Sequence, residues 1–278
     1  MSLSVLILTL NEEENLPTCL QSLQWCDDIV VLDSFSSDRT VDIAADAGAR
    51  VIQRRFDSWD AHQNWAMEHI TFKYPWVYYS DADETVPPDL RDEMRAVVRD
   101  PRVGHAAYRL RYKNFFCNRW IRHCGIYPVW VLRLFRPQAV RWERLVNPVP
   151  IVRGSIGELN GHFHHYSFRK GYEAWFHKHN KYSSQEALEG MKIEDRGVRD
   201  WSGIFSLKDA SRRRRAMKEL SFRLPCRPLF RFLYMYVVRL GLLDGIAGFR
   251  YCRLLAIYEY MIVLKTQEYA QRERGLSL

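Results

Sequence analysis

Short apolar runs alternate with amphipathic segments through the first hundred residues of the chain. Four apolar runs are too short for an independent helix, which is typical of buried strands: residues 3–10, 28–34, 49–55 and 76–80. Three segments between them have helical spacing of apolar positions: residues 12–25, 37–48 and 59–70. This alternation predicts an α/β fold with a mostly parallel sheet covered by helices on both faces.

The predicted helices carry signals at their ends. We expect the acidic cluster before Leu16 to begin the first helix, because the helix dipole favours negative charge there. Ser37 or Asp38 is the expected N-cap of the second helix, and Gly48 is expected to end it.

The pattern changes after residue 104. Residues 105–152 alternate or run as antiparallel strands do. Four further helices are predicted: residues 170–190, 206–224, 228–241 and 248–270. We therefore predict an α/β domain over residues 1–166, in halves of 1–104 and 105–166, and a basic, aromatic helical extension over residues 167–278.

Composition and charge narrow the class of protein. A chain of 278 residues with 47% hydrophobic residues can bury a real core. No basic segment precedes the first apolar run, which favours a strand over a signal peptide, and six cysteines without a CxxC pair are typical of reduced thiols in a cytosolic protein. The net charge is +8, and residues 201–278 carry 15 basic and 6 acidic side chains. Such a basic segment attracts nucleic acid, anionic lipid or a phosphorylated substrate.

Polar and charged side chains follow the strands of the predicted parallel sheet. In such sheets ligands bind at the carboxyl ends of the strands. The residues at these ends are Thr9, Asn11, Glu12, Asp33, Arg54, Arg55, Asp81 and Asp83. We therefore expect a ligand site with carboxylates from three strand ends and arginines from the fourth.

Asp81 and Asp83 form the sharpest of these signals. Two carboxylates one residue apart in a turn can share a divalent cation, and their oxygens suit Mg²⁺ or Mn²⁺. Taken alone, the pair indicates a solvated acidic turn before a helix that starts at Pro87 and Pro88. Its place after the fourth strand of an α/β half, with Asp33 ending the second, favours the metal site.

The other strand-end residues have structural alternatives. A carboxylate such as Asp33 can hold a ribose or base donor, or it can cap a turn. Asn11 and Glu12 can serve a ligand, or they can start a helix. The chain has no GxGxxG after its first strand, no GxxxxGK[ST], no HExxH and no Cys/His quartet. Dinucleotide oxidoreductases, P-loop enzymes and zinc enzymes are thereby disfavoured.

Four segments together resemble the inverting family 2 glycosyltransferases, whose nucleotide-sugar domain has the GT-A fold. They are LILTLNEEENL at 6–16, IVVLDSFSSDRT at 29–40, RRFDSWDAHQNWA at 54–66 and YYSDADETV at 78–86. The later segments HYSF, NKYSSQEA and GLLDGIAGF are more loosely similar to bacterial lipopolysaccharide-core β-glucosyltransferases. The resemblance implies a nucleotide-sugar half over residues 1–104 and an acceptor half over 105–166.

The resemblance also implies roles for the strand-end residues. Thr9, Asn11 and Glu12 would line the nucleotide pocket, and Asp33 would hold the base or ribose. Asp81 would contact ribose or metal, and Asp83 would bind Mg²⁺ or Mn²⁺. Related sequences carry a basic residue where this chain has Gln63. Neutralisation of the diphosphate is therefore expected from Arg54, Arg55 or His62.

Two further residues are expected at the reaction centre. An inverting transferase needs a general base for the acceptor hydroxyl, and Glu143 is the expected base because it lies where relatives carry a similar acidic segment. The alternative for Glu143 is an ion pair with Arg141 or Arg144. His165, in the family's HYS segment, is expected to complete the metal shell, and the alternative is a packed histidine of a strand.

The C-terminal segments predict a membrane contact. Arginines interleaved with aromatic and aliphatic residues suit a helix that lies in a bilayer interface, and no apolar stretch reaches the roughly 20 residues needed to span. The alternatives are helices packed on the core and a dimer interface. We expect a cytoplasmic protein, peripheral on the inner face of the cytoplasmic membrane.

These expectations combine into one functional hypothesis. The chain would move a hexose from a nucleotide-sugar, with UDP-sugars favoured, to a glycan or lipid-linked acceptor of lipopolysaccharide or a related polysaccharide, with Mg²⁺ or Mn²⁺. A nucleotidyltransferase with a two-carboxylate magnesium site is one alternative. A nucleic-acid-binding protein that uses the basic tail is another, although no recognisable reading module supports it.

Overall fold

The computed structural model describes residues 3–102, 104–143, 149–196, 200–202, 216 and 226–276. The chain divides into two compact units. The first comprises Met1–Trp120 and Ile126–Lys170, and the second comprises Ile121–Gly125 and Gly171–Leu278. The boundary expected from sequence lies at 166/167. The structure divides the chain after Lys170 instead, and it also assigns residues 121–125 to the second unit.

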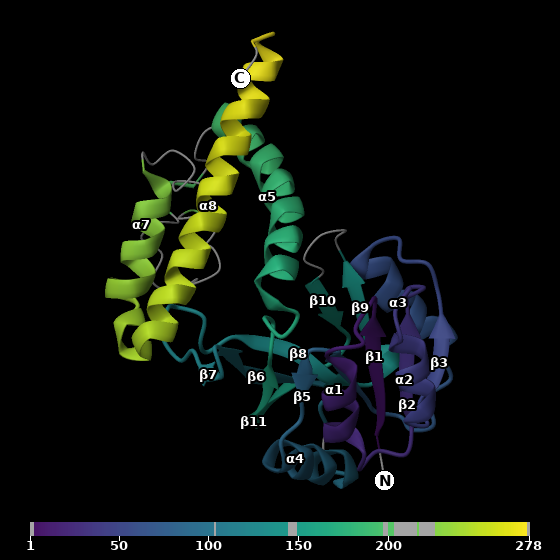
Figure 1. The fold of residues 1–278 in the computed structure, drawn as a ribbon. Helices are drawn as coiled ribbons and strands as arrows, with labels where there is room; N and C mark the ends of the chain where they lie inside the picture. Colours follow the sequence, from purple (N-terminus) through teal and green to yellow (C-terminus); the bar gives the residue numbers. More distant parts are fainter. Residues whose placement is uncertain are drawn as a thin grey trace. The chain divides into compact units, whose positions relative to one another are not determined.

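A single large sheet forms the centre of the first unit (Figure 1). Its parallel part has the order β3-β2-β1-β4. The strands are β1 (Ser4–Thr9), β2 (Ile29–Asp33), β3 (Arg50–Gln53) and β4 (Val77–Asp81). The helices between them are α1 (Leu16–Leu23), α2 (Thr40–Asp46) and α3 (Trp59–His69). All seven elements expected in this part of the chain are present.

The sheet continues through strands that are mostly antiparallel, in the order β4-β8-β6-β11-β5. Only β6 and β11 run parallel in this part. The elements are β5 (Glu84–Thr85), α4 (Pro88–Arg99), β6 (Ala107–Phe116), β7 (Arg119–Trp120), β8 (Trp130–Phe135), η1 (Pro137–Ala139) and β11 (Ile156–His165). A separate hairpin pairs β9 (Val140–Glu143) with β10 (Val149–Val152). The expected antiparallel character of residues 105–152 is therefore confirmed.

Buried apolar side chains cover both faces of the sheet. On one face, α1, α2 and α4 pack against β1, β2 and β4, with Leu20, Ala44 and Met94 buried in this core. On the other face, α3 and β9 supply Ala66 and Trp142 to a second core. Alternate residues of one strand serve the two cores, which explains why these strands are apolar at nearly every position.

The expected start of the first helix is wrong, and the second helix is capped by one of its two expected residues. The first helix begins at Leu16, with Pro17 in its first turn, and the acidic residues before it lie in the loop instead. Pro favours the first turn because its missing N–H has no helical partner there. In the second helix Arg39 occupies the N-cap position, but Asp38, one of the two expected caps, supplies the capping carboxylate, whose Oδ1 accepts from the Thr40 N–H at 3.0 Å. Its expected end is correct, since Gly48 has a positive φ of 77°.

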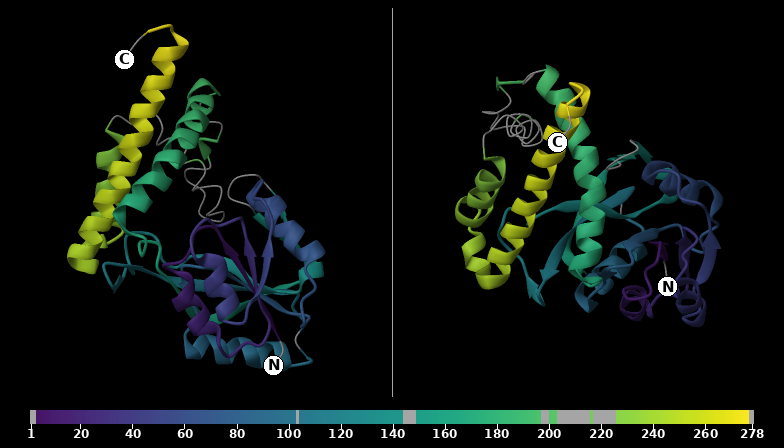
Figure 2. Two further views of the ribbon diagram at one scale, coloured as in Figure 1. Left: turned by 45° about the vertical axis from the view of Figure 1, so that its right-hand side comes forward. Right: turned by 45° about the horizontal axis from the view of Figure 1, so that its top comes forward.

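In the described part of the second unit, two long helices and one short helix pack together. They are α5 (Gly171–Arg196), α7 (Arg227–Leu233) and α8 (Gly245–Glu273). Figure 2 shows from two sides that α8 runs between α5 and α7. The π-helical turn η3 (Tyr234–Val238) and the 3₁₀ turn η4 (Gly241–Asp244) connect α7 to α8. The expected helix over residues 206–224 lies outside the described residues.

No single helix within the described ranges is long and apolar enough to cross a membrane. The segments Arg227–Val238 and Gly241–Glu273 have sufficient apolar length only when taken together, and they are bent by 74° with respect to each other.

The carboxylate of Asp28 connects β1, β3 and the segment before β4, at the edge of the sheet opposite to the carboxyl ends of the parallel strands. This carboxylate is only 6% exposed, and it accepts hydrogen bonds from the Ser4 hydroxyl, the Lys73 N–H at 2.8 Å and Arg50 Nη2 at 2.9 Å. Burial disfavours the charged form, but these donors outweigh it and hold the pKa of Asp28 below its ordinary value. The carboxylate therefore stabilises the folded chain while it is ionised.

We expect Asp28→Asn to lower the free energy of unfolding by about 2 kcal/mol at pH 7, because it removes charge-assisted hydrogen bonds. The folded pKa is depressed, so this contribution is fully present above the unfolded carboxyl pKa of about 3.9 and is lost as pH falls through the folded value. Urea unfolding at pH 7 and at decreasing pH measures it. The matched control is Asp92→Asn on α4, where the carboxylate is 61% exposed. A difference from wild type that stays constant down to pH 3 contradicts this account.

Candidate functional site

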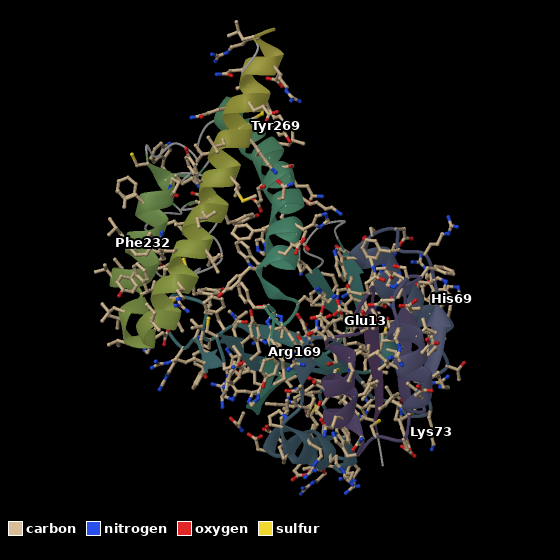
Figure 3. The ribbon with its side chains drawn as sticks, in the orientation of Figure 1. Glu13, His69, Lys73, Arg169, Phe232 and Tyr269 are labelled. Carbon is tan, nitrogen blue, oxygen red and sulfur yellow. The ribbon has the colours of Figure 1, made fainter. Side chains whose placement is uncertain are left out.

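The carboxyl ends of the parallel strands lie at one edge of the sheet. The register pairs Thr9 with Asp33, and it pairs Leu8 with Asp81. Figure 3 shows the side chains, with Glu13 labelled in the loop that follows β1. The polar residues after the strands therefore gather at one edge, as the parallel pattern predicted, and this edge is the candidate site.

Asp33 organises the loop that follows β2. Its carboxylate is fully buried and accepts hydrogen bonds from Thr9 Oγ1 at 3.0 Å, Ser36 N–H at 2.8 Å, Gln53 Nε2 at 3.3 Å and the Ser36 hydroxyl. Protein donors thus occupy both oxygens. The expected contact of Asp33 and Thr9 with a base or ribose stays a prediction, and it requires one of these hydrogen bonds to be exchanged.

Lys170 fixes the loop that follows β1. Its Nζ donates to the Asn11 carbonyl oxygen at 2.6 Å and forms an ion pair with Glu12 Oε1. Asn11 has a positive φ of 55°, and its Oδ1 accepts from the Ser37 N–H at 2.8 Å. Burial raises the pKa of Glu12, and Lys170 opposes this rise. The loops after β1 and β2 are therefore joined to each other and to the segment after β11.

The residues expected to neutralise a diphosphate differ in their surroundings. Arg54 forms an ion pair with Asp57 at 2.6 Å, and its Nη1 lies 2.9 Å from His62 Nδ1. His62 is buried, and burial together with Arg54 lowers its pKa, so a positive charge on His62 is disfavoured at neutral pH. Arg55 is exposed to solvent. Of Arg54, Arg55 and His62, Arg55 is therefore the cation whose side chain is open to solvent. Which of them neutralises a diphosphate stays a prediction.

Gln63 is buried, and its side chain contacts Tyr79 of β4, the strand that ends at Asp81. Its Nε2 lies 3.4 Å from the Tyr79 hydroxyl, which donates to Asp81 Oδ1 at 2.9 Å. Gln63 therefore supports Asp81 through Tyr79, which accounts for a neutral side chain at this position of α3.

A buried arginine lies beneath the acidic motif. Arg133 of β8 is 8% exposed, and its Nη2 donates to Asp81 Oδ2 at 2.6 Å and to Glu84 Oε1. The guanidinium also lies over the ring of Tyr79, with its Cζ 4.6 Å from the centroid. Burial raises the pKa of Glu84 to about 8, and Arg133 opposes that rise. Arg133 thus balances the negative charge of Asp81 and of ionised Glu84.

Asp83 points toward a different partner. Its Oδ2 lies 3.3 Å from His165 Nε2, and the two side chains are 24% and 27% exposed. Backbone pairing supports this contact, because His165 is opposite Glu84 in the β11–β5 ladder and the Tyr166 N–H donates to the Asp83 carbonyl at 2.9 Å. Burial lowers the pKa of His165, but Asp83 outweighs it and the net shift is upward. The geometry brings together two of the three expected metal ligands.

The neighbouring histidines behave as packed strand residues. His162 Nε2 lies 2.9 Å from the Tyr127 hydroxyl, and His164 packs on the ring of Phe115. Burial lowers the pKa of both imidazoles. Of the histidine cluster, His165 is therefore the member that meets the acidic motif.

Glu143 is the last residue of β9, and its side chain is exposed. The preceding residue is held firmly, because Asn64 Nδ2 donates to the Trp142 carbonyl and Asn64 Oδ1 accepts from the Trp142 N–H, each at 2.8 Å. Arg144, one of its two alternative ion-pair partners, lies outside the described residues. The role of Glu143 as general base stays a prediction.

Two charged residues of this region were not singled out by the sequence analysis. Arg133 interrupts the apolar strand segment WVLRLF, and a lone cation in such a segment is the signal that could have identified it. Lys170 carries no comparable signal, because it lies next to Arg169 in a basic segment between a strand and a helix.

Arg133 gives a prediction about stability. We expect Arg133→Met to lower the free energy of unfolding by about 3 kcal/mol, the low end for a buried pair, because partly exposed Asp81 and buried Glu84, when ionised, lose their cation. The matched control is Arg109→Met on the adjacent β6, whose ion pair with Glu158 is exposed and contributes about 0–1 kcal/mol. Denaturant unfolding of both variants measures the difference, and equal losses contradict the buried role.

The sequence model of "Glycosyl transferase family 2" matches residues 4–158. The uncharacterized glycosyltransferase RT0209 of Rickettsia typhi is 24% identical over 294 residues, covering 99% of this chain and 89% of that protein. The lipopolysaccharide core biosynthesis glycosyltransferase LpsC of Rhizobium meliloti is 34% identical over 119 residues, covering 40% of this chain and 43% of LpsC.

Solved structures are more distant. S. aureus TarS 1-349 in complex with UDP-GlcNAc has 14% identity and a TM-score of 0.44, covering 98% of this chain and 92% of that chain. Glucosyl-3-phosphoglycerate synthase of Mycobacterium tuberculosis has 20% identity and a TM-score of 0.34, covering 40% of this chain and 44% of that chain.

The match of the family model covers more than half of the chain, and it spans all four parallel strands together with the acidic motif. The predicted fold class, a GT-A α/β domain with a mostly parallel central sheet and a C-terminal helical extension, is confirmed. The chain belongs to glycosyl transferase family 2.

Proposed function

We propose that this family 2 glycosyltransferase moves a hexose, with inversion, from a nucleotide-sugar to a hydroxyl of a glycan in lipopolysaccharide-core or related polysaccharide assembly. UDP-sugars are the favoured donors. The similarity to LpsC supports the acceptor class over 40% of the chain. The observation that carries the donor proposal is the cluster of strand-end residues around the Asp83–His165 pair.

The donor set at this pair fits a divalent cation. Asp83 Oδ2 and His165 Nε2 are 3.3 Å apart and partly exposed, so both can reach one ion. Among the described residues no set of three His, Cys, Asp or Glu side chains is arranged around a common metal position, so oxygens of the donor diphosphate and water would fill the other places. Mg²⁺ or Mn²⁺ held there would neutralise charge on the departing nucleoside diphosphate.

The residues of the chain prepare this site. The Arg133 guanidinium forms an ion pair with Asp81. The Asp83 carboxylate instead faces His165 on β11. Lys170 holds the loop after β1, where Asn11 and Glu12 are expected to line the nucleotide pocket. In this arrangement the protein positions the donor before an acceptor arrives.

Glu143 is proposed as the general base. Its carboxylate is exposed at the end of β9, where it can meet an acceptor from solvent, and Asn64 fixes the strand behind it. It would take the proton of the acceptor hydroxyl as the oxygen attacks C1 of the sugar.

The acceptor sets the expected location. We propose that the protein acts at the inner face of the cytoplasmic membrane, with peripheral contact through its C-terminal helices, because a lipid-linked acceptor is held there. Membership of family 2 favours glycosyl transfer over a nucleotidyltransferase and over a nucleic-acid-binding protein.

Removal of the Asp83 carboxylate tests donor and metal together. We expect Asp83→Ala to abolish the Mn²⁺-dependent part of UDP-sugar binding, because the cation loses its anionic ligand. Isothermal titration calorimetry with UDP-, GDP- and dTDP-sugars, with and without Mn²⁺ or Mg²⁺, measures it. Asp92→Ala is the control, since that carboxylate is exposed on α4. Donor binding by the wild type that is equally tight in EDTA argues against the cation.

The base assignment has its own test. We expect Glu143→Gln to lower kcat by about 10²–10⁴-fold while donor affinity stays unchanged, because a general base acts only on the acceptor proton. Glu158→Gln is the control, as an exposed glutamate of the same unit. Steady-state transfer rates and donor calorimetry provide the two readouts, and wild-type kcat in Glu143→Gln eliminates this residue as the base.

A further inference from the structure

The turn between α7 and α8 exposes a dense group of apolar side chains, here called the apolar tip, over residues 234–246. Seven of its side chains are at least 43% exposed: Tyr234, Val237, Val238, Leu240, Leu242, Leu243 and Ile246. Exposed apolar side chains are common singly, but seven within thirteen residues is a density typical of an interaction site.

The backbone of the tip holds these side chains outward. Leu240 has a positive φ of 56°, which turns the chain between η3 and η4. A Cβ at Gly248 would lie 2.2 Å from the Gly241 carbonyl oxygen, so the close approach of η4 to α8 requires glycine there. Met235 is nearly fully buried and fills the space behind the turn. The backbone conformation of this turn therefore keeps its apolar side chains exposed to solvent.

Buried polar contacts anchor the tip from behind. Asp244 is 3% exposed, and its carboxylate accepts from the His123 N–H at 2.8 Å and from the Arg122 N–H at 3.3 Å. The Cys124 N–H donates to the Arg239 carbonyl at 3.1 Å. Segment 121–125 thus fastens both ends of the turn within the second unit.

The exposed charge around the tip has one sign. Between residues 232 and 249 the chain has two charged side chains, Arg239, which is exposed, and Asp244, which is buried. Exposed arginines flank the tip at 231, 250 and 253, and of these Arg231 lies 3.9 Å from Glu259. The solvent-facing charge near the apolar surface is therefore positive, which is complementary to an anionic surface.

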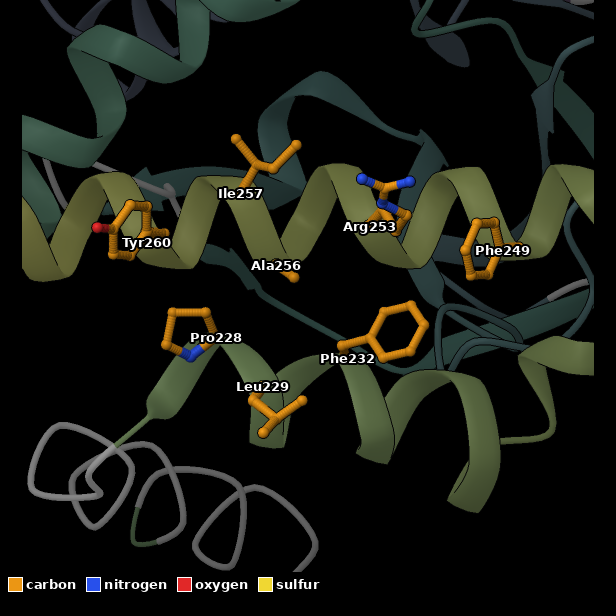
Figure 4. A pocket seen from close by; sticks show the side chains of 8 residues that line it. All are labelled: Pro228, Leu229, Phe232, Phe249, Arg253, Ala256, Ile257 and Tyr260. Carbon is orange, nitrogen blue, oxygen red and sulfur yellow. The ribbon is translucent and has the colours of Figure 1, made fainter.

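A groove beside the tip extends the apolar surface between α7 and α8 (Figure 4). Its volume is about 460 Å³. Pro228, Leu229 and Phe232 line it from α7, and Phe249 and Ile257 line it from α8. Arg253 also lines this groove, with its Cζ 5.6 Å from the centroid of the Phe249 ring. One cation beside apolar walls suits the phosphate and acyl chain of a lipid.

We propose that the apolar tip inserts into one leaflet of an anionic phospholipid membrane and that Arg250 and Arg253 bind lipid phosphates at its rim. The inference rests on the proposed function in one respect, since it names the residues that make the proposed membrane contact. Insertion is shallow, because the helix pair is bent by 74° and interfacial elements bury about 5–10 Å into the headgroup region. The positive rim favours lipid over a second copy of this equally basic surface.

Vesicle binding tests the apolar contact. In co-sedimentation of the full chain with phosphatidylcholine vesicles containing phosphatidylglycerol, we expect Val238→Glu and Leu243→Glu each to weaken binding at least tenfold, because each places a charge in the apolar layer. The control is Leu188→Glu on α5, an equally exposed leucine at 51%. Circular dichroism verifies folding of each variant.

The rim has a separate test. Arg250→Gln combined with Arg253→Gln should weaken binding about fivefold for each arginine at low salt, and the loss should shrink as salt rises. Lys178→Gln combined with Lys181→Gln on α5 is the control, since both lysines are exposed. Equal binding to pure phosphatidylcholine vesicles overturns the role of the arginines.

Other outcomes decide against the insertion itself. Unchanged vesicle binding in the tip variants overturns it, as does the same loss in Leu188→Glu. A lipid-free dimer that Val238→Glu dissociates, with no vesicle binding by the wild type, assigns the surface to a second copy. Donor calorimetry is independent of lipid, so vesicle binding without UDP-sugar binding refutes the proposed function alone, and the reverse result refutes the insertion alone.

Discussion

The guanidinium of Arg133, buried between Asp81 and Glu84, is the interaction on which the acidic end of the sheet depends. Three elements meet there, since Asp81 ends β4, Glu84 begins β5 and Arg133 belongs to β8. Glu84 is 2% exposed and Asp81 is 38% exposed, and ionised Glu84 without a cation would cost several kcal/mol, so the chain would have to neutralise it. With Arg133 in place, the turn between β4 and β5 can carry Asp83 outward. Pairing of β5 with β11 then brings His165 to Asp83.

This arrangement gives the two aspartates of the motif different electrostatic roles. Asp81 accepts from Tyr79 and pairs with Arg133, so most of its charge is matched inside the protein. Asp83 faces an imidazole whose proton a metal can replace. A motif that reads as two equivalent carboxylates in sequence is thus asymmetric in three dimensions. Under the proposed function, Asp83 would be the dominant anionic ligand of the cation.

Local patterns predicted the parallel half of the fold and the edge at which its polar residues gather. Both follow from apolar periodicity and from the rule for strand ends, which act over a few residues. The start of α1 was misplaced because the dipole argument gave weight to the acidic residues, whereas Pro17 set the first turn. Arg133 and Lys170 were missed for another reason: their partners are distant in sequence, so no window of sequence contains both members of either pair.

In the second unit, sequence patterns predicted the helices but not the geometry of the turn between α7 and α8. Periodicity predicted helices over 228–241 and 248–270, but the break between them comes from Leu240 in the left-handed region and from the contact of Gly248 with Gly241. A longer continuous helix could have turned these apolar residues toward α5. The bend instead directs them to solvent, and Asp244 fastens it with buried hydrogen bonds. This polar anchor fixes the exposure of the apolar side chains, and such exposure is what the proposed membrane contact requires.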